Sequence, residues 1–339
     1  MSSITMERKI IFPPCAYVFD THTDIQNYFI ETIERHGIDA AIEGIKEKKK
    51  DELSYPKVLK FEWEGHEGDL FEFSEYVDFS NSYSVRCNEP FCEIDNLKIG
   101  TKYYWRINGG KTQHFFTKDN KIRFIRIDGA LNVRDLGGNK IEQGLIYRGS
   151  DIDLIYPISE RGKETFLDIL GIKTEIDLRM EVNGNRPCIF GNRVVLKSFP
   201  YRPYNEIFEA EHRQGICKIM DFLSDENNYP IYIHCIAGAD RTGMISLFLR
   251  ALAGESDDDI HMDYELTSLS TSTYAYGAQE MDFRTRNGSY YTEFLEMLDI
   301  YAPGKSLSEK VRAFLIDCGV TNECLDTILC IIKKKKYKG

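Results

Sequence analysis

The sequence has no long hydrophobic run and no excess of positive charge. No stretch approaches the roughly 20 apolar residues that span a bilayer, and no N-terminal segment joins a basic region to the roughly 7–15 apolar residues of a signal peptide. A net charge of −11 and a pI near 5.3 disfavour nonspecific binding to nucleic acid or to an anionic membrane. We therefore expect a soluble, cytoplasmic protein whose anion site is a local positive pocket. A signal peptide removed from this chain would reverse the expected localisation.

The cysteines lack the pattern of a disulfide framework or a metal site. There are nine, an odd number, and they are scattered without paired spacing. Reduced thiols in a cytosolic protein fit this pattern best, and we expect no metal ion and no other cofactor. A chain of 339 residues is long enough for two domains that each bury a core.

The first part of the chain changes from a helical to an alternating pattern. Apolar residues after Thr23 have helical spacing, and Gly37 is a suitable helix end. The charged segment 38–50 is typical of a solvated helix face or a loop. From Pro56 onward apolar and polar residues alternate as in half-buried strands, beginning with Leu59, Phe61 and Trp63.

Segment 97–107 carries a more specific signal in this part. It reads Leu-Lys-Ile-Gly-Thr-Lys-Tyr-Tyr-Trp-Arg-Ile and resembles the fibronectin type III signature Leu-x-x-Gly-Thr-x-Tyr-x-Trp-x-Val. The resemblance covers about residues 56–118 and implies a small β-sandwich, with Trp63 in the core and the Tyr103 hydroxyl anchoring the preceding corner. We expect a first domain at 1–118, a sandwich with a helical insertion, that has a structural or partner-binding role.

The strongest functional signal lies between a predicted strand and a predicted helix. The strand is 230–234, the helix is 243–252, and the tight loop between them carries Cys235 and Arg241. If the loop curls around a point, its N–H groups and the helix N-terminus form a nest for a tetrahedral dianion. The expected phosphate-binding residues are Ile236, Ala237, Gly238, Ala239, Asp240 and Arg241.

Two side chains give this loop its chemistry. Arg241 can close the nest with a two-pronged hydrogen bond to phosphate oxygens. A cysteine at a helix N-terminus beside an arginine can have its pKa lowered from ~8.5 to roughly 3.5–7.5. We therefore expect Cys235 to be a thiolate at neutral pH and to attack phosphorus.

These residues carry a family resemblance. The segment 234–243, His-Cys-Ile-Ala-Gly-Ala-Asp-Arg-Thr-Gly, resembles the His-Cys-x5-Arg-Thr-Gly signature of cysteine-dependent protein tyrosine phosphatases, in the form used by a bacterial branch. Three earlier segments, 126–138, 144–150 and 170–179, are similar to further blocks of that branch, including Asn-x-Arg-Asp-Leu-Gly-Gly. The resemblance implies activity on phosphotyrosine, and sometimes on phosphoserine or phosphoinositides.

The fold expected for residues 122–339 is an α/β phosphatase domain. Short strands that end in polar clusters alternate with helix-like segments such as 159–170, which argues for a central, mostly parallel sheet flanked by helices. Ligands then bind beyond the carboxyl ends of the strands, where Cys235 lies. The three segments that resemble the phosphatase branch contain five charged residues near the predicted site: Arg134, Asp135, Arg148, Asp177 and Arg179. These residues could line the pocket or form salt bridges that support the loop from below, and we favour the supporting role. We also expect His234 to support the loop rather than act as a base.

The resemblance implies two-step covalent catalysis through a cysteinyl phosphate. Thr242, next to the sulfur, can hydrogen-bond the thiolate as it leaves in the second step. No Trp-Pro-Asp sequence lies between residues 199 and 230, so a family acid from that loop is missing. In the bacterial branch, the acid is proposed to be an aspartate inside the loop, and the matching residue Asp240 is our preferred general acid. The alternatives are three glutamates of the segment that precedes the loop: Glu206, Glu209 and Glu211.

Ala239 departs from the branch, which commonly has lysine at this position. Without that cation we expect weaker binding of polyphosphorylated inositols, which favours phosphotyrosine in a phosphorylated protein, or a small phosphomonoester, with a broader specificity left open. The alternatives are a phosphoinositide or inositol-polyphosphate phosphatase, a noncatalytic phosphate-binding adaptor and a rhodanese-like sulfurtransferase. A protein partner could bind through the sandwich; no nucleic acid and no membrane span are expected.

Two segments follow the loop helix. Segment 268–291, rich in serine, threonine, glycine and aromatic residues, could form a wall over the phosphate site or pack as an ordinary surface excursion. Segment 307–332 has helix periodicity and closes the domain.

Overall fold

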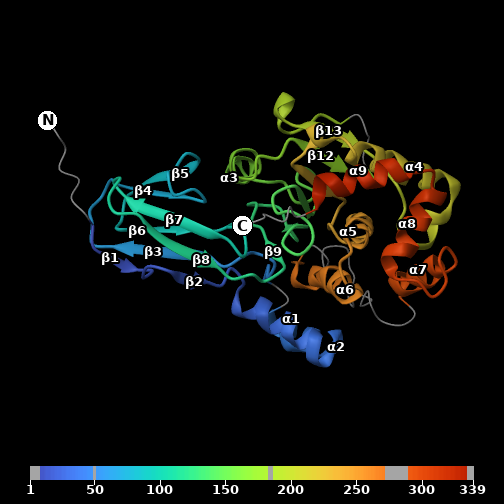
Figure 1. Cartoon of the computed structure of the whole chain (residues 1–339), viewed down its shortest axis with the longest axis horizontal. Coiled ribbons are helices and arrows are strands. Elements are labelled where there is room, and N and C mark those ends of the chain that lie inside the picture. The colour runs from blue at the N-terminus through green and yellow to red at the C-terminus, as the bar shows by residue number, and fades with distance from the viewer. Residues whose placement is uncertain (1–7, 49–50, 182–185, 272–288, 334–339) are drawn as a thin grey trace. The chain divides into compact units, whose positions relative to one another are not determined.

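The computed structural model describes residues 8–48, 51–181, 186–271 and 289–333 (Figure 1). The chain divides into two compact units. The first contains Met1–Thr23 and Pro56–Arg123, and the second contains Asp24–Tyr55 and Phe124–Gly339. In the described part of the chain, no helix is long and apolar enough to cross a bilayer.

The first unit consists of two sheets that share one core. The three-stranded sheet has the order β1 (Ile10–Phe12), β3 (Leu59–Trp63), β6 (Phe91–Ile94). The five-stranded sheet has the order β2 (Tyr17–Phe19), β8 (Gln113–Thr117), β7 (Lys102–Ile107), β4 (Asp69–Ser74), β5 (Ser82–Cys87).

The alternation predicted from Pro56 onward is confirmed in this core. Leu59, Phe61 and Trp63 are buried, whereas the intervening Lys60 is exposed. The Phe61 ring lies 5.2 Å from the Phe71 ring of the other sheet, so the apolar faces of the two sheets meet.

A tyrosine fixes the corner that precedes β7. The backbone N–H of Lys98 donates a 2.9 Å hydrogen bond to the Tyr103 hydroxyl, and the Tyr103 ring is buried against Phe115. The hydroxyl therefore satisfies a backbone donor in a segment that has no strand partner.

The second unit begins with two helices, α1 (Asp24–His36) and α2 (Ile38–Ile45), and a 3₁₀ turn η1 (Lys46–Lys48). The predicted helix end at Gly37 is confirmed, with a φ of 81° at that glycine. Segment 38–50 contains the helix α2, whose Asp39 and Glu43 are exposed, as a solvated helix face requires. The other face of α2 is buried through Ala41, Ile42 and Ile45, because those apolar residues have helical spacing. The predicted domain division at 118–122 stays a prediction; by contacts, residues 24–55 group with the second unit.

The sheet of the second unit has six strands in the order β13 (Val195–Ser198), β12 (Thr174–Asp177), β14 (Ile231–His234), β11 (Ile146–Gly149), β10 (Arg134–Asp135), β9 (Arg123–Phe124). The four strands β13, β12, β14 and β11 run parallel, and β10 pairs with β11 antiparallel. The carboxyl ends of the parallel strands thus share one edge, where β14 leads into Cys235.

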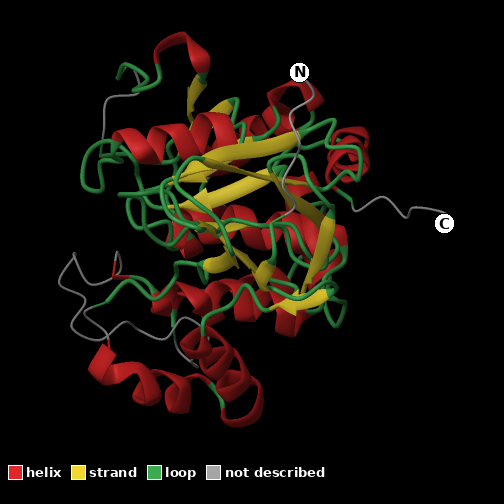
Figure 2. Cartoon of the chain, turned by 90° about the vertical axis from the view of Figure 1, so that its left-hand side faces the viewer, coloured by secondary structure: helices red, strands yellow, loops and turns green. Residues whose placement is uncertain are grey.

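Helices cover both faces of this sheet (Figures 1 and 2). After residue 159 the helical segments of this unit are α3 (Glu160–Glu164) with a π-helical turn η2 (Thr165–Ile169), η3 (Gly191–Arg193), η4 (Tyr204–Phe208), α4 (Ala210–Leu223), η5 (Glu226–Asn228), α5 (Asp240–Ala253), α6 (Asp257–Glu265), η6 (Leu266–Leu269), α7 (Tyr290–Asp299), α8 (Leu307–Asp317) and α9 (Asn322–Ile332). Ile231 and Ile233 of β14 face the core of α4 and α5, whereas Tyr232 faces the core that contains Phe166.

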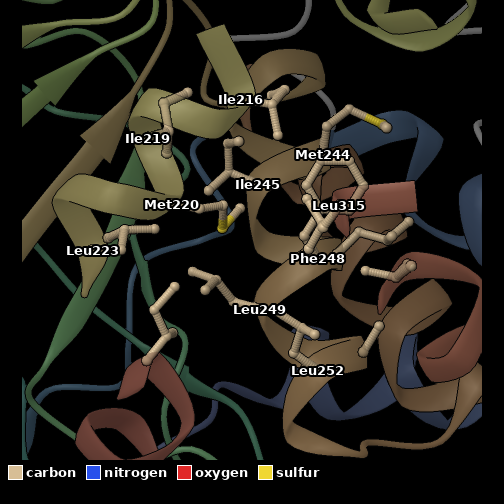
Figure 3. Close-up of a cluster of buried hydrophobic side chains, with 14 of the residues drawn as sticks. Ile216, Ile219, Met220, Leu223, Met244, Ile245, Phe248, Leu249, Leu252 and Leu315 are labelled. Atoms are coloured by element: carbon tan, nitrogen blue, oxygen red, sulfur yellow. The ribbon is translucent and has the colours of Figure 1, made fainter. Parts of the chain in front are cut away.

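Helix α5 is the central element of the larger core. Every residue from Thr242 to Ala253 is buried, so the helix is apolar or paired on all sides. Figure 3 shows Ile245 and Leu249 of α5 facing Met220 of α4, whereas Phe248 lies on the other side of α5 beside Leu315, and its ring is 5.7 Å from that of Phe314 of α8. The N-terminus of α5 is therefore held by a rigid core rather than by a surface loop.

We predict that Tyr103→Phe destabilises the first unit by about 1–2 kcal/mol, because the Lys98 N–H loses its acceptor. The sequence has two tryptophans, Trp63 and Trp105, and both lie in this unit, so urea unfolding followed by tryptophan fluorescence reports on it selectively. Tyr104→Phe, on the opposite face of β7, is the matched control. Equal urea midpoints for the two variants would contradict the role of the Tyr103 hydroxyl.

Candidate active site

The loop between β14 and α5 is held from outside by its carbonyl groups. The Ile236 carbonyl accepts from the Asp151 N–H at 2.8 Å. Asn132 Nδ2 donates to the carbonyls of Ala237 at 3.0 Å and Gly238 at 3.2 Å, and Arg148 Nη2 donates to Gly238 O at 2.7 Å. Because the C=O and N–H of a trans peptide point in opposite directions, the N–H groups that follow these carbonyls face the inner side of the loop. This is the arrangement that an anion nest requires.

Gly238 is required at the tightest point of the loop. Its φ is 67°, and a Cβ built there would lie 2.3 Å from the backbone of Gly149 at the end of β11. The close approach of these two backbones brings the loop against the strand edge, and any side chain would separate them.

A buried carboxylate holds the arginines under the loop. Asp263 of α6 accepts from Arg134 Nε at 3.1 Å and from Arg148 Nη1 at 2.6 Å, and a third arginine, Arg250, lies 3.4 Å away. Burial raises the pKa of Asp263, but the three guanidinium groups outweigh it and hold that pKa far below its usual range. Arg134 and Arg148 are thus supports of the loop, paired behind it, rather than lining residues of the cavity described below.

The remaining predicted supports are also paired. His234 Nε2 lies 2.9 Å from Glu175 Oε1, and Arg179 binds Asp177 through Nη2 at 2.8 Å. Burial lowers the pKa of His234, but the hydrogen bond to Glu175 raises it above its ordinary value. Asp135 accepts from two backbone N–H groups, those of Gly137 and Gly144, and so fixes the turn after β10.

Cys235 lies at the bottom of the loop with 3% of its surface exposed. Burial raises the pKa of the thiol, but the Arg241 charge and hydrogen bonds from the hydroxyl and N–H of Thr242 lower it by more, so that the net pKa is below the ordinary value. Apart from the sulfur, the buried Thr242 hydroxyl has no hydrogen-bond partner among the described residues. The environment of Cys235 therefore favours the thiolate.

Arg241 is held in place by a carboxylate that the sequence did not reveal. Glu181 binds Arg241 with both oxygens, at 2.8 Å to Nη1 and 3.0 Å to Nη2, although 51% of the Glu181 side chain is exposed. The paired guanidinium lowers the pKa of Glu181 in spite of partial burial. A guanidinium has five N–H donors, so this pair leaves donors of Arg241 for a phosphate.

A cavity of about 820 Å³ opens next to the loop. Its walls combine aromatic and charged side chains, and it is lined by Met180, Glu181, Tyr201, Arg202, Pro203, Tyr204, Asn205, Glu206, Asp240, Arg241 and Tyr290. Asp240 and Arg241 of the predicted phosphate site lie in this cavity, at the N-terminus of α5.

The acid candidates have different positions. Asp240 lines the cavity and its Oδ1 accepts a hydrogen bond from the Tyr204 hydroxyl. Glu206 also lines the cavity and is paired with Arg202 at 3.1 Å. Glu209 and Glu211 are exposed at the start of α4 and are not among the lining residues.

Segment 268–291 falls largely outside the described residues, which end at 271 and resume at 289. Of its described part, Tyr290 lines the cavity and Tyr291 is buried. Within the described ranges, no group of three or more histidine, cysteine or acidic residues is arranged to hold a metal ion.

The sequence model of the tyrosine phosphatase family matches residues 125–329. This range is more than half of the chain and contains the loop and its supports, and the protein therefore belongs to the tyrosine phosphatase family. Among solved structures, the chain is similar to the core catalytic domain of the PP-IP phosphatase SIW14 from S. cerevisiae in complex with citrate, with 20% identity, 38% of this chain and 75% of that chain covered, and a TM-score of 0.30. No curated protein matches the chain.

We predict that Cys235 is alkylated by iodoacetamide at a lower pH than an ordinary thiol, and that Arg241→Ala moves its midpoint upward, because burial then acts with less opposing charge. Peptide-level mass spectrometry measures each cysteine separately. A Cys235 midpoint that Arg241→Ala leaves unchanged would contradict an activated thiol.

Proposed function

We propose that the protein hydrolyses phosphate monoesters through a cysteinyl-phosphate intermediate, as a protein tyrosine phosphatase. The observation that supports this most directly is the position of Cys235 beneath the α5 N-terminus, where Arg241 and Thr242 lower its pKa. A buried structural cysteine in apolar surroundings would have its pKa raised, as burial does for Cys92.

In the first step, the Cys235 sulfur attacks phosphorus in line and forms an S–P bond while the bond to the ester oxygen breaks. The inward N–H groups of the loop and the guanidinium of Arg241 hold the equatorial oxygens, whose charge is stabilised in the transition state. Asp240 gives its proton to the departing oxygen, since it lies in the same cavity as Arg241.

In the second step, water attacks phosphorus and the S–P bond breaks. Asp240, now ionised, accepts a proton from that water. The Thr242 hydroxyl hydrogen-bonds the departing thiolate, which makes sulfur a better leaving group.

The walls of the cavity favour an aromatic ester over a polyphosphate. Tyr204 and Tyr290 stack at a centroid distance of 5.9 Å and offer an aromatic surface beside Arg241. The lining residues include three carboxylates and two arginines, so the wall has no excess of positive charge to bind further phosphates: Glu181, Glu206 and Asp240 against Arg202 and Arg241. Ala239, buried in the loop, adds no cation either. We therefore rank phosphotyrosine above inositol polyphosphates and phosphoinositides, and a broader protein specificity remains compatible with the open cavity.

For the N-terminal part we propose a fibronectin type III-like domain within about residues 1–118 that binds a protein partner, followed by the phosphatase domain at 122–339. The sandwich itself is formed by the residues of the first unit, and the helical insertion 24–55 groups by contacts with the second unit. The two packed sheets and the Tyr103 corner support the first assignment. A working Cys235 thiolate requires reducing conditions, which supports a cytoplasmic location.

We predict that Cys235→Ser abolishes hydrolysis of p-nitrophenyl phosphate, because the serine hydroxyl is not ionised in this environment, and that EDTA leaves the wild-type rate unchanged. The wild-type protein should hydrolyse phosphotyrosine peptides with a higher kcat/KM than inositol hexakisphosphate or a phosphoinositide. Cys15→Ser, at an exposed position of the other unit, is the matched control. Undiminished turnover by Cys235→Ser would refute the mechanism, whereas the reverse substrate order would refute only the substrate assignment.

We predict that Asp240→Asn removes the alkaline limb of the pH profile of kcat/KM, because that limb reports ionisation of the acid. The rate below the limb should fall roughly 10²-fold or more, the usual contribution of general acid catalysis. Glu206→Gln is the comparison, since Glu206 lines the same cavity. If Asp240→Asn keeps the limb and Glu206→Gln loses it, Glu206 is the acid.

A further inference from the structure

Tyr204, at the start of η4, connects three elements around the mouth of the cavity. Its ring stacks on Tyr290 of α7 with an interplanar angle of 26°. Its hydroxyl contacts Oδ1 of Asp240 on α5 and lies 2.7 Å from the hydroxyl of Tyr264 on α6. The motifs of the sequence did not single out Tyr204 or Tyr264 for a chemical role, whereas Tyr290 lies in segment 268–291, the possible wall over the phosphate site.

The backbone of Tyr204 has an unusual conformation. Its φ is 58°, in the left-handed region that bulky residues rarely adopt. Such a conformation persists where surrounding contacts impose it, and it clusters at functional sites. Here it turns the side chain toward the N-terminus of α5, and Ile207 in the following turn is fully buried.

The hydroxyl of Tyr204 is positioned by the buried residue Tyr264. Tyr264 is 1% exposed, and its ring packs where a Cβ on Gly243 would lie, 2.6 Å from Cε2. Tyr264 is therefore fixed against the first turn of α5, and its hydroxyl fixes that of Tyr204. The Asp240 carboxyl thus contacts a donor that is positioned by two packed aromatic rings.

A general acid must present its proton in one direction. A carboxyl group rotates about its Cβ–Cγ bond, and a hydrogen bond to Oδ1 sets that rotation and with it the direction of Oδ2. Asp240 lines the cavity together with Arg241, so the orientation set by Tyr204 determines whether the proton reaches the leaving oxygen.

We propose that Tyr204 is a positioning residue for catalysis: its hydroxyl holds the Asp240 carboxyl in the orientation from which the proton passes to the leaving oxygen. This inference rests on the proposed function, in which Asp240 is the general acid. Tyr204 forms no bond to the substrate in this role, and the proton transferred is that of Asp240.

Several titratable groups face Asp240 and act on its ionisation. Cys235 and Arg241 lie beside it in the loop and in α5, and Tyr201 and Tyr264 lie on the buried side. Glu181, Arg202 and Glu206 line the open cavity with it. Among these neighbours Tyr204 donates directly to the carboxylate and stabilises its ionised form, so removal of the hydroxyl favours the protonated form.

The test is Tyr204→Phe, which removes the hydroxyl and keeps the ring on Tyr290. We expect kcat/KM for phenyl phosphate to fall about tenfold, which is part of the usual contribution of general acid catalysis. We expect kcat/KM for p-nitrophenyl phosphate to fall by less than about threefold, because nitrophenolate is a better leaving group and needs less protonation. The alkaline limb of kcat/KM should move to higher pH, since the remaining carboxyl ionises less readily. The alkylation midpoint of Cys235 should stay in place.

Two further variants separate positioning from packing. Tyr264→Phe removes the hydroxyl behind Tyr204 and should change the same quantities in the same direction by a smaller factor. Tyr301→Phe, whose ring packs on Phe208 away from the cavity-lining residues, is the control and should leave both substrates and the limb unchanged. In the Asp240→Asn background, Tyr204→Phe should cause no further loss, because the hydroxyl then has no acid to orient.

The outcomes distinguish this inference from the proposed function. Equal losses on both substrates with an unmoved limb mean that Tyr204 only supports the fold, and the inference is overturned while the cysteine mechanism stands. An alkaline limb that survives in Asp240→Asn overturns the acid assignment and the role of Tyr204 together. Activity in Cys235→Ser refutes the covalent mechanism itself.

Discussion

The second unit depends on three carbonyl groups that point out of one loop. Asp151, Asn132 and Arg148 bind the carbonyls of Ile236, Ala237 and Gly238, and this pairing turns the following amides inward. The donors all lie in segment 132–151, far from the loop in sequence, and Asp263 binds Arg148 on the side away from the loop. A chain of buried polar contacts of this kind is costly if one member is removed, because the remaining groups are left unpaired in a medium of low dielectric constant.

The local part of this arrangement could be predicted from the sequence. A strand of apolar residues, a short loop and an apolar helix follow one another at 231–253, so periodicity and the order of residues define them without knowledge of the fold. The alternation of Leu59, Phe61 and Trp63 likewise predicted their burial. The preference for support roles at Arg134 and Arg148 agrees with their pairing to Asp263, and such pairing is expected because buried charges are seldom left unpaired.

The contacts that complete the cavity could not be predicted, because no local pattern marks them. Glu181 reaches Arg241 across 60 positions of sequence, and Tyr204 reaches Asp240 across 36. A left-handed φ at a tyrosine has no signal in the residue type, since only glycine and asparagine adopt it readily. The apolar face of α2 was present in the sequence, but the charged residues around it concealed the spacing of Ala41, Ile42 and Ile45.

The segment Asp24–Tyr55 interrupts the first unit and belongs by contacts to the second. Glu52 binds the backbone N–H of Thr271 at 2.9 Å, and the Leu53 N–H donates to the Leu269 carbonyl at 2.9 Å. The polypeptide therefore passes between the units three times, and no single cut separates them. A fragment that starts after the sandwich would lack α1, α2 and these bonds, so the second unit as the contacts define it is encoded by two separate stretches of the gene.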